Sequence, residues 1–208
     1  MKRLIAIASV LFCVAALSAQ SRFGGGASLG FTVNQLSGDG FSGFNKPGAF
    51  AGFFGNYAIN TKNWFQFEIN FIQKGAYKAP KDDDPTKYLL GLNYVELPLL
   101  YKFMPFGNRF VFELGPSFGY LISHTERTEQ GDYNVPGREF KKLEIAALLG
   151  INYHIGKSFW VNLRGIQSVV PIRSHQGNAV FILNRGQYSS TLCLSLRYVF
   201  QGNTNTNN

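Results

Sequence analysis

The segment that most constrains the fold runs from Tyr188 to Phe200 and reads YSSTLCLSLRYVF. From Leu192 onward every second residue is apolar or aromatic, and the residues between them are mostly smaller or more polar. A period of two is typical of a β-strand with one apolar and one mostly polar face. In a water-soluble sheet the apolar face needs a partner layer, whereas in a membrane barrel it needs only lipid.

The N-terminus has the three parts of a secretory signal peptide. A basic start at Lys2 and Arg3 is followed by an apolar run to Leu17 and by the small residue Ala19. The apolar run is too short for a spanning helix, which needs about 20 residues. We therefore expect residues 1–19 to be cleaved and the mature chain to be exported.

Export limits both the cysteine chemistry and the partners. Cys13 falls in the signal peptide, so Cys193 is the single mature cysteine and cannot form an internal disulfide. Loss of Lys2 and Arg3 leaves 18 basic and 12 acidic residues, a net charge of +6. Such a charge suits an anionic surface such as lipopolysaccharide phosphates, although a generally basic solvated surface explains it equally well. Nucleic acid is not an expected partner after export.

Seven further segments have strand-like character, and the chain is rich in aromatic residues, with 20 Phe and 10 Tyr. The predicted strands are Phe23–Val33, Gly48–Ile59, Trp64–Lys74, Leu89–Phe103, Phe110–Ser123, Lys142–Ile155, Phe159–Val169 and Tyr188–Phe200. Phe50 and Phe54 interrupt the alternation of the second strand, so its pattern does not decide which face each takes.

The connections alternate in length, which a soluble meander does not require. Long polar segments follow the first, third, fifth and seventh strands, and short turns follow the second, fourth and sixth. Outer-membrane barrels combine short periplasmic turns with longer outer loops. We therefore predict an all-β, eight-stranded antiparallel up-and-down transmembrane β-barrel over residues 20–200, followed by a polar tail at 201–208. An even strand number places both barrel termini in the periplasm.

Three stretches carry a family resemblance: YVELPLLYKF at 94–103, ELGPSFGY at 113–120 and LSLRYVF at 194–200. The assembled pattern resembles small barrels of the Bacteroidetes-type outer membrane protein β-barrel domain family, which includes PorT-like proteins. The resemblance covers essentially the whole mature chain and implies a barrel fold and a place in the bacterial outer membrane. For the PorT-like members it further implies an association with a protein-secretion system.

The inward faces of the predicted strands carry charges of both signs. These are Glu68, Glu96, Glu113, Glu144, Arg164, Arg197, Lys74 and Lys102. The interior of an eight-stranded barrel is just wide enough for its side chains to fill, so buried charges there must pair or become neutral. We predict an internal network that holds the barrel together and fills it, which argues against an open diffusion pore.

The other polar residues do not form a pattern that indicates catalysis or metal binding. The histidines are scattered without a metal-ligand spacing, and Asp82–Asp84 lacks the alternating ligands of a calcium loop. A lipid A hydrolase would need Ser123 and His124 to act together, but adjacent residues on a strand point to opposite faces, which disfavours that reading. We expect no enzymatic activity and no cofactor.

Aromatic residues gather near the short-turn ends of the strands. They are Trp64, Phe65, Tyr101, Phe103, Phe110, Tyr153, Phe159, Trp160, Tyr198 and Phe200. The outward-facing members are expected to form a girdle at the periplasmic membrane interface.

The sequence favours a structural or interaction role through the outer loops, within a secretion or envelope complex, with outer-membrane lipid and lipopolysaccharide as neighbours. The alternative is a narrow channel for small solutes. A lipid A-modifying enzyme and a secreted lipocalin-like barrel are further, less favoured readings.

Overall fold

The computed structural model describes residues 22–37, 43–80, 86–107, 109–129, 131–132, 139–156, 158–174 and 186–200. The predicted signal peptide, the polar tail, His175 and the Asp82–Asp84 run lie outside these residues. Among the described residues, no helix has the length and apolar character needed to cross a bilayer.

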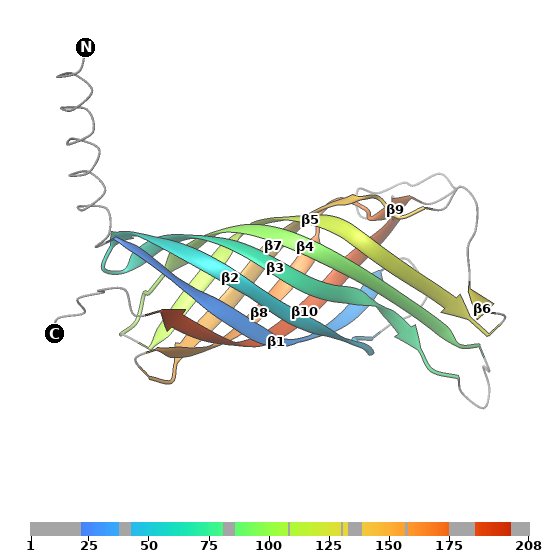
Figure 1. The fold of residues 1–208 in the computed structure, drawn as a ribbon, viewed down its shortest axis with the longest axis horizontal. Helices are drawn as coiled ribbons and strands as arrows, with labels where there is room; N and C mark the ends of the chain where they lie inside the picture. Colours follow the sequence, from blue (N-terminus) through green and yellow to red (C-terminus); the bar gives the residue numbers. More distant parts are fainter. Residues whose placement is uncertain are drawn as a thin grey trace, which may run out of the picture.

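Eight long antiparallel strands form a closed ring within the described residues (Figure 1). They are β1 (Phe23–Ser37), β2 (Lys46–Asn60), β3 (Asn63–Lys78), β4 (Tyr88–Phe103), β5 (Phe110–Thr128), β7 (Leu143–His154), β8 (Phe159–Ser168) and β10 (Gly186–Phe200). Two short strands, β6 (Gly131–Asp132) and β9 (Arg173–Ser174), pair with β5 and β10. The ring closes between β1 and β10, from Ser37 opposite Tyr188 to Gly25 opposite Phe200. The predicted eight-stranded up-and-down barrel is confirmed.

The two ends of the barrel differ as the loop lengths predicted. β1 begins and β10 ends at the end that carries the short connections, here called the short-turn end, and the long connections lie at the opposite, loop end (Figure 1). Six of the long strands extend further toward the loop end than predicted, whereas β7 and β8 are each one residue shorter there. Asn34 lies in β1 and not in the predicted loop, and it donates from Nδ2 to the carbonyls of Lys46 and Gln73 at 2.9 and 3.2 Å.

A β-bulge changes the facing of β5 near its loop end. Tyr94 pairs with Leu121 but Asn93 pairs with Ser123, so Ile122 is the extra residue. An extra residue shifts the two-residue alternation of everything beyond it. As a result Glu126, which was predicted to lie in a loop, is a strand residue with a buried side chain.

The outer wall is apolar on every long strand and ends in an aromatic girdle at the short-turn end. Leu29, Leu143 and Leu149 are each about two-thirds exposed, as lipid-facing side chains are in the absence of lipid. The girdle consists of the ring contacts Phe23–Tyr57, Phe65–Tyr101, Tyr101–Phe103, Phe103–Phe112, Phe110–Tyr153, Phe159–Tyr198 and Tyr198–Phe200. Trp64 and Trp160 are half-buried, and the Trp160 ring packs 3.7 Å from that of His154.

The facing of β2, left open by the sequence, is settled by its two interior phenylalanines. Phe50 and Phe54 are 0% and 7% exposed. Gly26 makes room for Phe54, because a Cβ at Gly26 would lie 2.3 Å from Phe54 Cζ. The two rings lie beside the Arg164 and Arg197 guanidinium groups, at 6.0 and 5.4 Å.

Candidate functional site

The candidate site is the barrel interior, where all eight charged residues proposed from the sequence are buried. The structure divides them into two clusters. The larger cluster contains Glu68, Glu113, Arg164, Arg197 and Lys102, and the smaller contains Lys74, Glu96 and Glu144. Four carboxylates thus face four basic groups.

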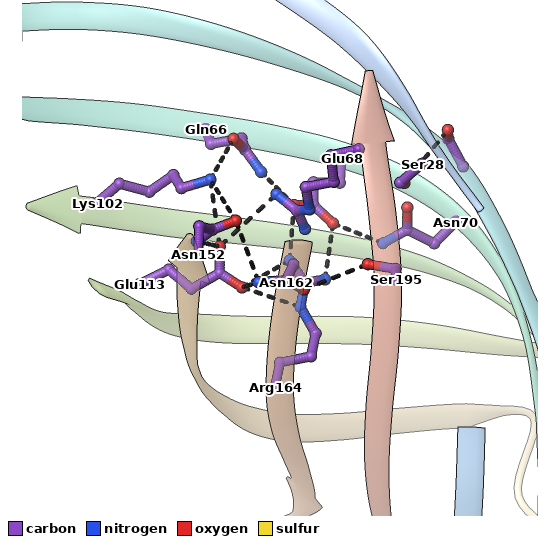
Figure 2. Close-up of polar contacts among 12 residues, drawn as sticks. Ser28, Gln66, Glu68, Asn70, Lys102, Glu113, Asn152, Asn162, Arg164 and Ser195 are labelled. Carbon is purple, nitrogen blue, oxygen red and sulfur yellow. Dashed lines mark hydrogen bonds and ion pairs between the residues drawn. The ribbon is translucent and has the colours of Figure 1, made fainter. Parts of the chain in front are cut away.

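Arg164 of β8 is the centre of the larger cluster (Figure 2). Its NH1 and NH2 groups donate to the two oxygens of Glu68 at 2.8 and 2.9 Å. Its Nε donates to Glu113 Oε1 at 3.0 Å, and its NH2 lies 2.8 Å from the same oxygen. The planar guanidinium therefore joins β8 to β3 and to β5 with charge-assisted bonds, one pair of them bidentate.

Arg197 and Lys102 complete the cluster from two more strands. Arg197 NH2 donates to Glu68 Oε1 at 2.9 Å, and Lys102 Nζ lies 3.2 Å from Glu113 Oε2. Five strands, β3, β4, β5, β8 and β10, thus meet in one network across the barrel.

Four interior amides donate further hydrogen bonds to the carboxylate oxygens of Glu68 and Glu113 (Figure 2), and none was among the predicted site residues. Asn70 donates to Glu68 Oε2 at 2.8 Å, and Gln66 also donates to Glu68. Asn152 and Asn162 each donate to Glu113 at 2.9 Å. All four follow the same two-residue period as the charges, so the alternation could have identified them.

The smaller cluster lies closer to the loop end and is centred on Lys74. Lys74 Nζ lies 2.6 Å from Glu96 Oε1 and 2.8 Å from Glu144 Oε1. Ser189 Oγ donates to Glu144 Oε1 at 2.5 Å, and the Lys74 ammonium lies 5.4 Å from the Tyr94 ring. The formal charge is −1 here and +1 in the larger cluster, so the two together are neutral.

An apolar cluster fills the interior at the loop end. Its members include Leu36, Phe50, Ile72, Leu90, Leu92, Leu121, Phe140, Leu148, Ile166 and Ile172. Phe140 and Ile172 come from the connections after β5 and after β8, and they are 6% and 0% exposed. The Lys141 amide donates to the Ile172 carbonyl at 2.8 Å. The two connections therefore join each other and cover this part of the interior.

A buried ion pair holds these covering segments to the barrel wall. Arg173 donates from NH1 and NH2 to the two oxygens of Glu126 at 3.0 and 2.5 Å, and its guanidinium lies 3.8 Å from the Phe140 ring. The Tyr88 hydroxyl donates to Glu126 at 2.6 Å. Burial acts to raise the pKa of Glu126, but the bonds from Arg173 and Tyr88 outweigh it and hold the pKa below its ordinary value.

The geometry of the isolated histidines does not assemble a nucleophile and a base. Ser123 accepts a hydrogen bond from Asn93 Nδ2 at 2.9 Å, whereas the His124 ring packs 5.5 Å from that of Phe140. Within the described ranges, no group of three or more His, Cys, Asp or Glu side chains is placed to hold a metal ion.

Comparison with known proteins agrees with this architecture. The crystal structure of Ail from Yersinia pestis with the heparin analogue sucrose octasulfate is similar, with 13% identity over 86% of this chain and 99% of that chain, at a TM-score of 0.51. The Neisserial surface protein A structure has 16% identity over 86% and 97%, at a TM-score of 0.52. At such identities the likeness shows the fold alone.

Sequence comparison identifies the family. No curated protein matches the chain. The PorT-like and Bacteroidetes-type part of the resemblance stays a prediction. Residues 18–172 match the family model described as outer membrane protein beta-barrel domain, which spans most of the chain. The chain therefore belongs to the outer membrane protein β-barrel domain family and is an outer-membrane barrel.

Proposed function

We propose that this protein is a filled outer-membrane barrel that acts through the surface of its loop end, as a structural or interaction component of the envelope. The observation that carries the proposal is the occupied interior. Two ion-pair clusters and an apolar cluster follow one another along the barrel and leave the outer surfaces as the place for function. In this proposal the loops face the exterior, and the short turns and both barrel termini face the periplasm.

The charge of the loop end favours an anionic partner. Apart from the Glu126–Arg173 pair and the interior clusters, the sequence has nine basic and seven acidic residues in the loop-end connections and strand ends, a net charge of +2. The basic ones that the structure describes are Lys46, Lys78, Lys87, Arg127, Lys141 and Lys142. Lipopolysaccharide phosphates match this excess, and the similar barrel Ail has been crystallised with a sulfated polyanion. A secretion or envelope protein bound at the same end is part of this proposal.

Affinity purification from detergent-solubilised envelope tests the proposal. We expect lipopolysaccharide, with or without envelope proteins, to co-purify with the wild-type chain. A triple variant, Arg127→Ser, Lys141→Ser and Lys142→Ser, should lose most of that material. Arg22→Ser, Lys62→Ser and Arg109→Ser remove the same charge from the short-turn end and serve as the control.

Two outcomes would contradict the proposal. One is equal recovery with both triple variants, because it would show that the loop end is not the binding surface. The other is a stable unit conductance of the pure protein in planar bilayers, which would show an open path through the interior and support the narrow channel.

A further inference from the structure

The outer wall contains an apolar groove in its short-turn half, far from the loop end. The groove is open to the outside and has a volume of about 730 Å³ across strands β1 to β5, and its lining includes Phe23, Gly55, Tyr57, Phe65, Leu99 and Gly115. This volume falls in the range of roughly 300–1,000 Å³ that is typical of small-molecule sites. A lipid-facing wall filled by regular side chains would present a ridged surface without such a hollow.

Missing side chains and an interrupted ladder create the hollow. Gly55 faces outward between Phe53 and Tyr57, and a Cβ built on it would meet no atom within 4 Å. Strands β4 and β5 pair at Pro98–Ser117 and again at Tyr101–Leu114, and the four residues between these pairs line the groove. The hollow therefore results from the outward glycine and from the gap in the β4–β5 pairing.

The groove lies where a phospholipid could place its headgroup at the membrane interface and its acyl chain in the hydrocarbon. At its short-turn side it is lined by Phe23, Tyr57, Phe65 and Tyr101, which belong to the aromatic girdle. Aromatic girdles of outer-membrane barrels lie at the membrane interface, so the groove runs from the interface into the hydrocarbon.

Cations lie next to that side of the groove. Arg22 precedes the lining residue Phe23, and Lys62 lies in the turn between β2 and β3, which both line the groove. Both side chains are exposed, as is that of Arg109 in the β4–β5 connection. Among the described turn and strand-end residues here, none is acidic. Basic groups at this level attract anionic headgroups.

We propose that this groove binds one acyl chain of an anionic phospholipid, whose phosphate lies against Arg22 and Lys62. The hydrocarbon around the barrel supplies the chain, and the cations select the headgroup. The groove is at the opposite end from the loop surface proposed above, and its binding is independent of that surface.

The test uses the full protein in phosphatidylcholine nanodiscs that contain a minority of phosphatidylglycerol, with retained lipid counted by native mass spectrometry. The wild type should retain phosphatidylglycerol above its share of the disc. Gly55→Leu fills the groove and should lower retention at least about fourfold, the factor for one buried methylene. Gly55→Ala should fall between the two.

Gly91→Leu is the matched control for the groove. Gly91 also faces outward, and a Cβ there also meets nothing within 4 Å, but it lies in the loop-end half of β4 outside the groove. This variant should retain lipid as the wild type does. The mobility of unheated samples on gels confirms that each variant is folded.

Arg22→Ser and Lys62→Ser test the headgroup. Each should lower the preference for phosphatidylglycerol over phosphatidylcholine by about fivefold, as expected for a cation near an anionic lipid surface. Equal retention by Gly55→Leu and the wild type would overturn the acyl-chain site. Equal retention of the two lipids by the wild type would overturn the headgroup assignment. A lipid-free dimer that Gly55→Leu abolishes would show instead that a second copy occupies the groove.

Discussion

At the scale of single residues, Arg164 is the side chain on which the interior most depends. It forms ion pairs with both Glu68 and Glu113, and all three side chains are at most 1% exposed. Removing one partner of a buried pair leaves an uncompensated charge, which costs more than the pair itself contributes. The free energy of unfolding should therefore fall strongly when one interior charge is removed, and less when both partners of a pair are removed.

Arg164→Leu should lower the free energy of unfolding by roughly 3–5 kcal/mol, the cost of breaking a buried pair. Urea titration in detergent micelles, followed by gel mobility, measures the loss. Gln167→Ala, on the outward face of the same strand, should change it by less than about 0.5 kcal/mol, as surface substitutions do. Adding Glu113→Gln to Arg164→Leu should restore part of the loss, and strictly additive losses would contradict charge pairing as the cause.

Sequence alternation identified the charged residues of the interior but not everything that surrounds them. A period of two decides which face a residue takes, which is why the eight charges could be named. It does not show whether the residue paired on the neighbouring strand is small enough to leave room for a large inward side chain. Phe54 fits inside because the residue paired with it on the neighbouring strand β1 is Gly26, where a Cβ would lie 2.3 Å from Phe54 Cζ.

At the scale of elements, the bulge in β5 creates a contact that no local pattern could reveal. If Ile122 were paired in the regular alternation instead of bulging, Glu126 would take the outward face and could not meet Arg173. Arg173 itself lies 47 residues further along the chain, in a segment predicted as a loop. The sequence therefore assigned both partners to solvent-exposed loops, whereas the structure uses them to hold Phe140 and Ile172 over the interior.

The Glu126–Arg173 contact should depend on pH. The pKa of Glu126 is lower in the folded protein than its ordinary 4.5, so its contribution is fully present above that value and is lost as the pH falls through the lower, folded value. We expect the amide resonances of residues 171–173 to shift with a midpoint below 4.5 in micelle NMR titrations.

Glu126→Gln provides the control for that titration, because it removes the ionisable group and keeps a hydrogen-bonding side chain of similar size. The variant should show the loop-segment shifts at neutral pH and no acid transition of its own. A wild-type midpoint at or above the ordinary carboxyl value would show that Arg173 does not stabilise the carboxylate in solution.

At the scale of the whole molecule, the barrel could be predicted from the sequence because two patterns are enough to indicate it. Strand period gives the two faces, and the alternation of long and short connections gives the two ends. The way in which Phe140 and Ile172 cover the interior at the loop end could not be predicted, because it depends on contacts between the connections after β5 and after β8. The filled interior follows from the strand number, whereas its division into two charge clusters follows from register.

The closing ladder between β1 and β10 leads to the last prediction. It contains 13 residue pairs and ends at Phe200 opposite Gly25, so deletion of residues 201–208 removes none of them. That deletion should leave the mobility of the unheated protein unchanged. Ending the chain at Ser195 removes five pairs, from Leu29–Leu196 to Gly25–Phe200, together with the Arg197–Glu68 ion pair.

The shorter chain then has unpaired backbone groups on β1 and β8 in the hydrocarbon, each costing several kcal/mol. Together these exceed the roughly 5–15 kcal/mol that stabilises a typical protein. We therefore expect the chain ending at Ser195 to fail to refold into lipid vesicles, as judged by gel mobility and protease protection. Folding of this chain to wild-type yield would show that the barrel tolerates an open seam, and that closure at Phe200 does not determine its insertion.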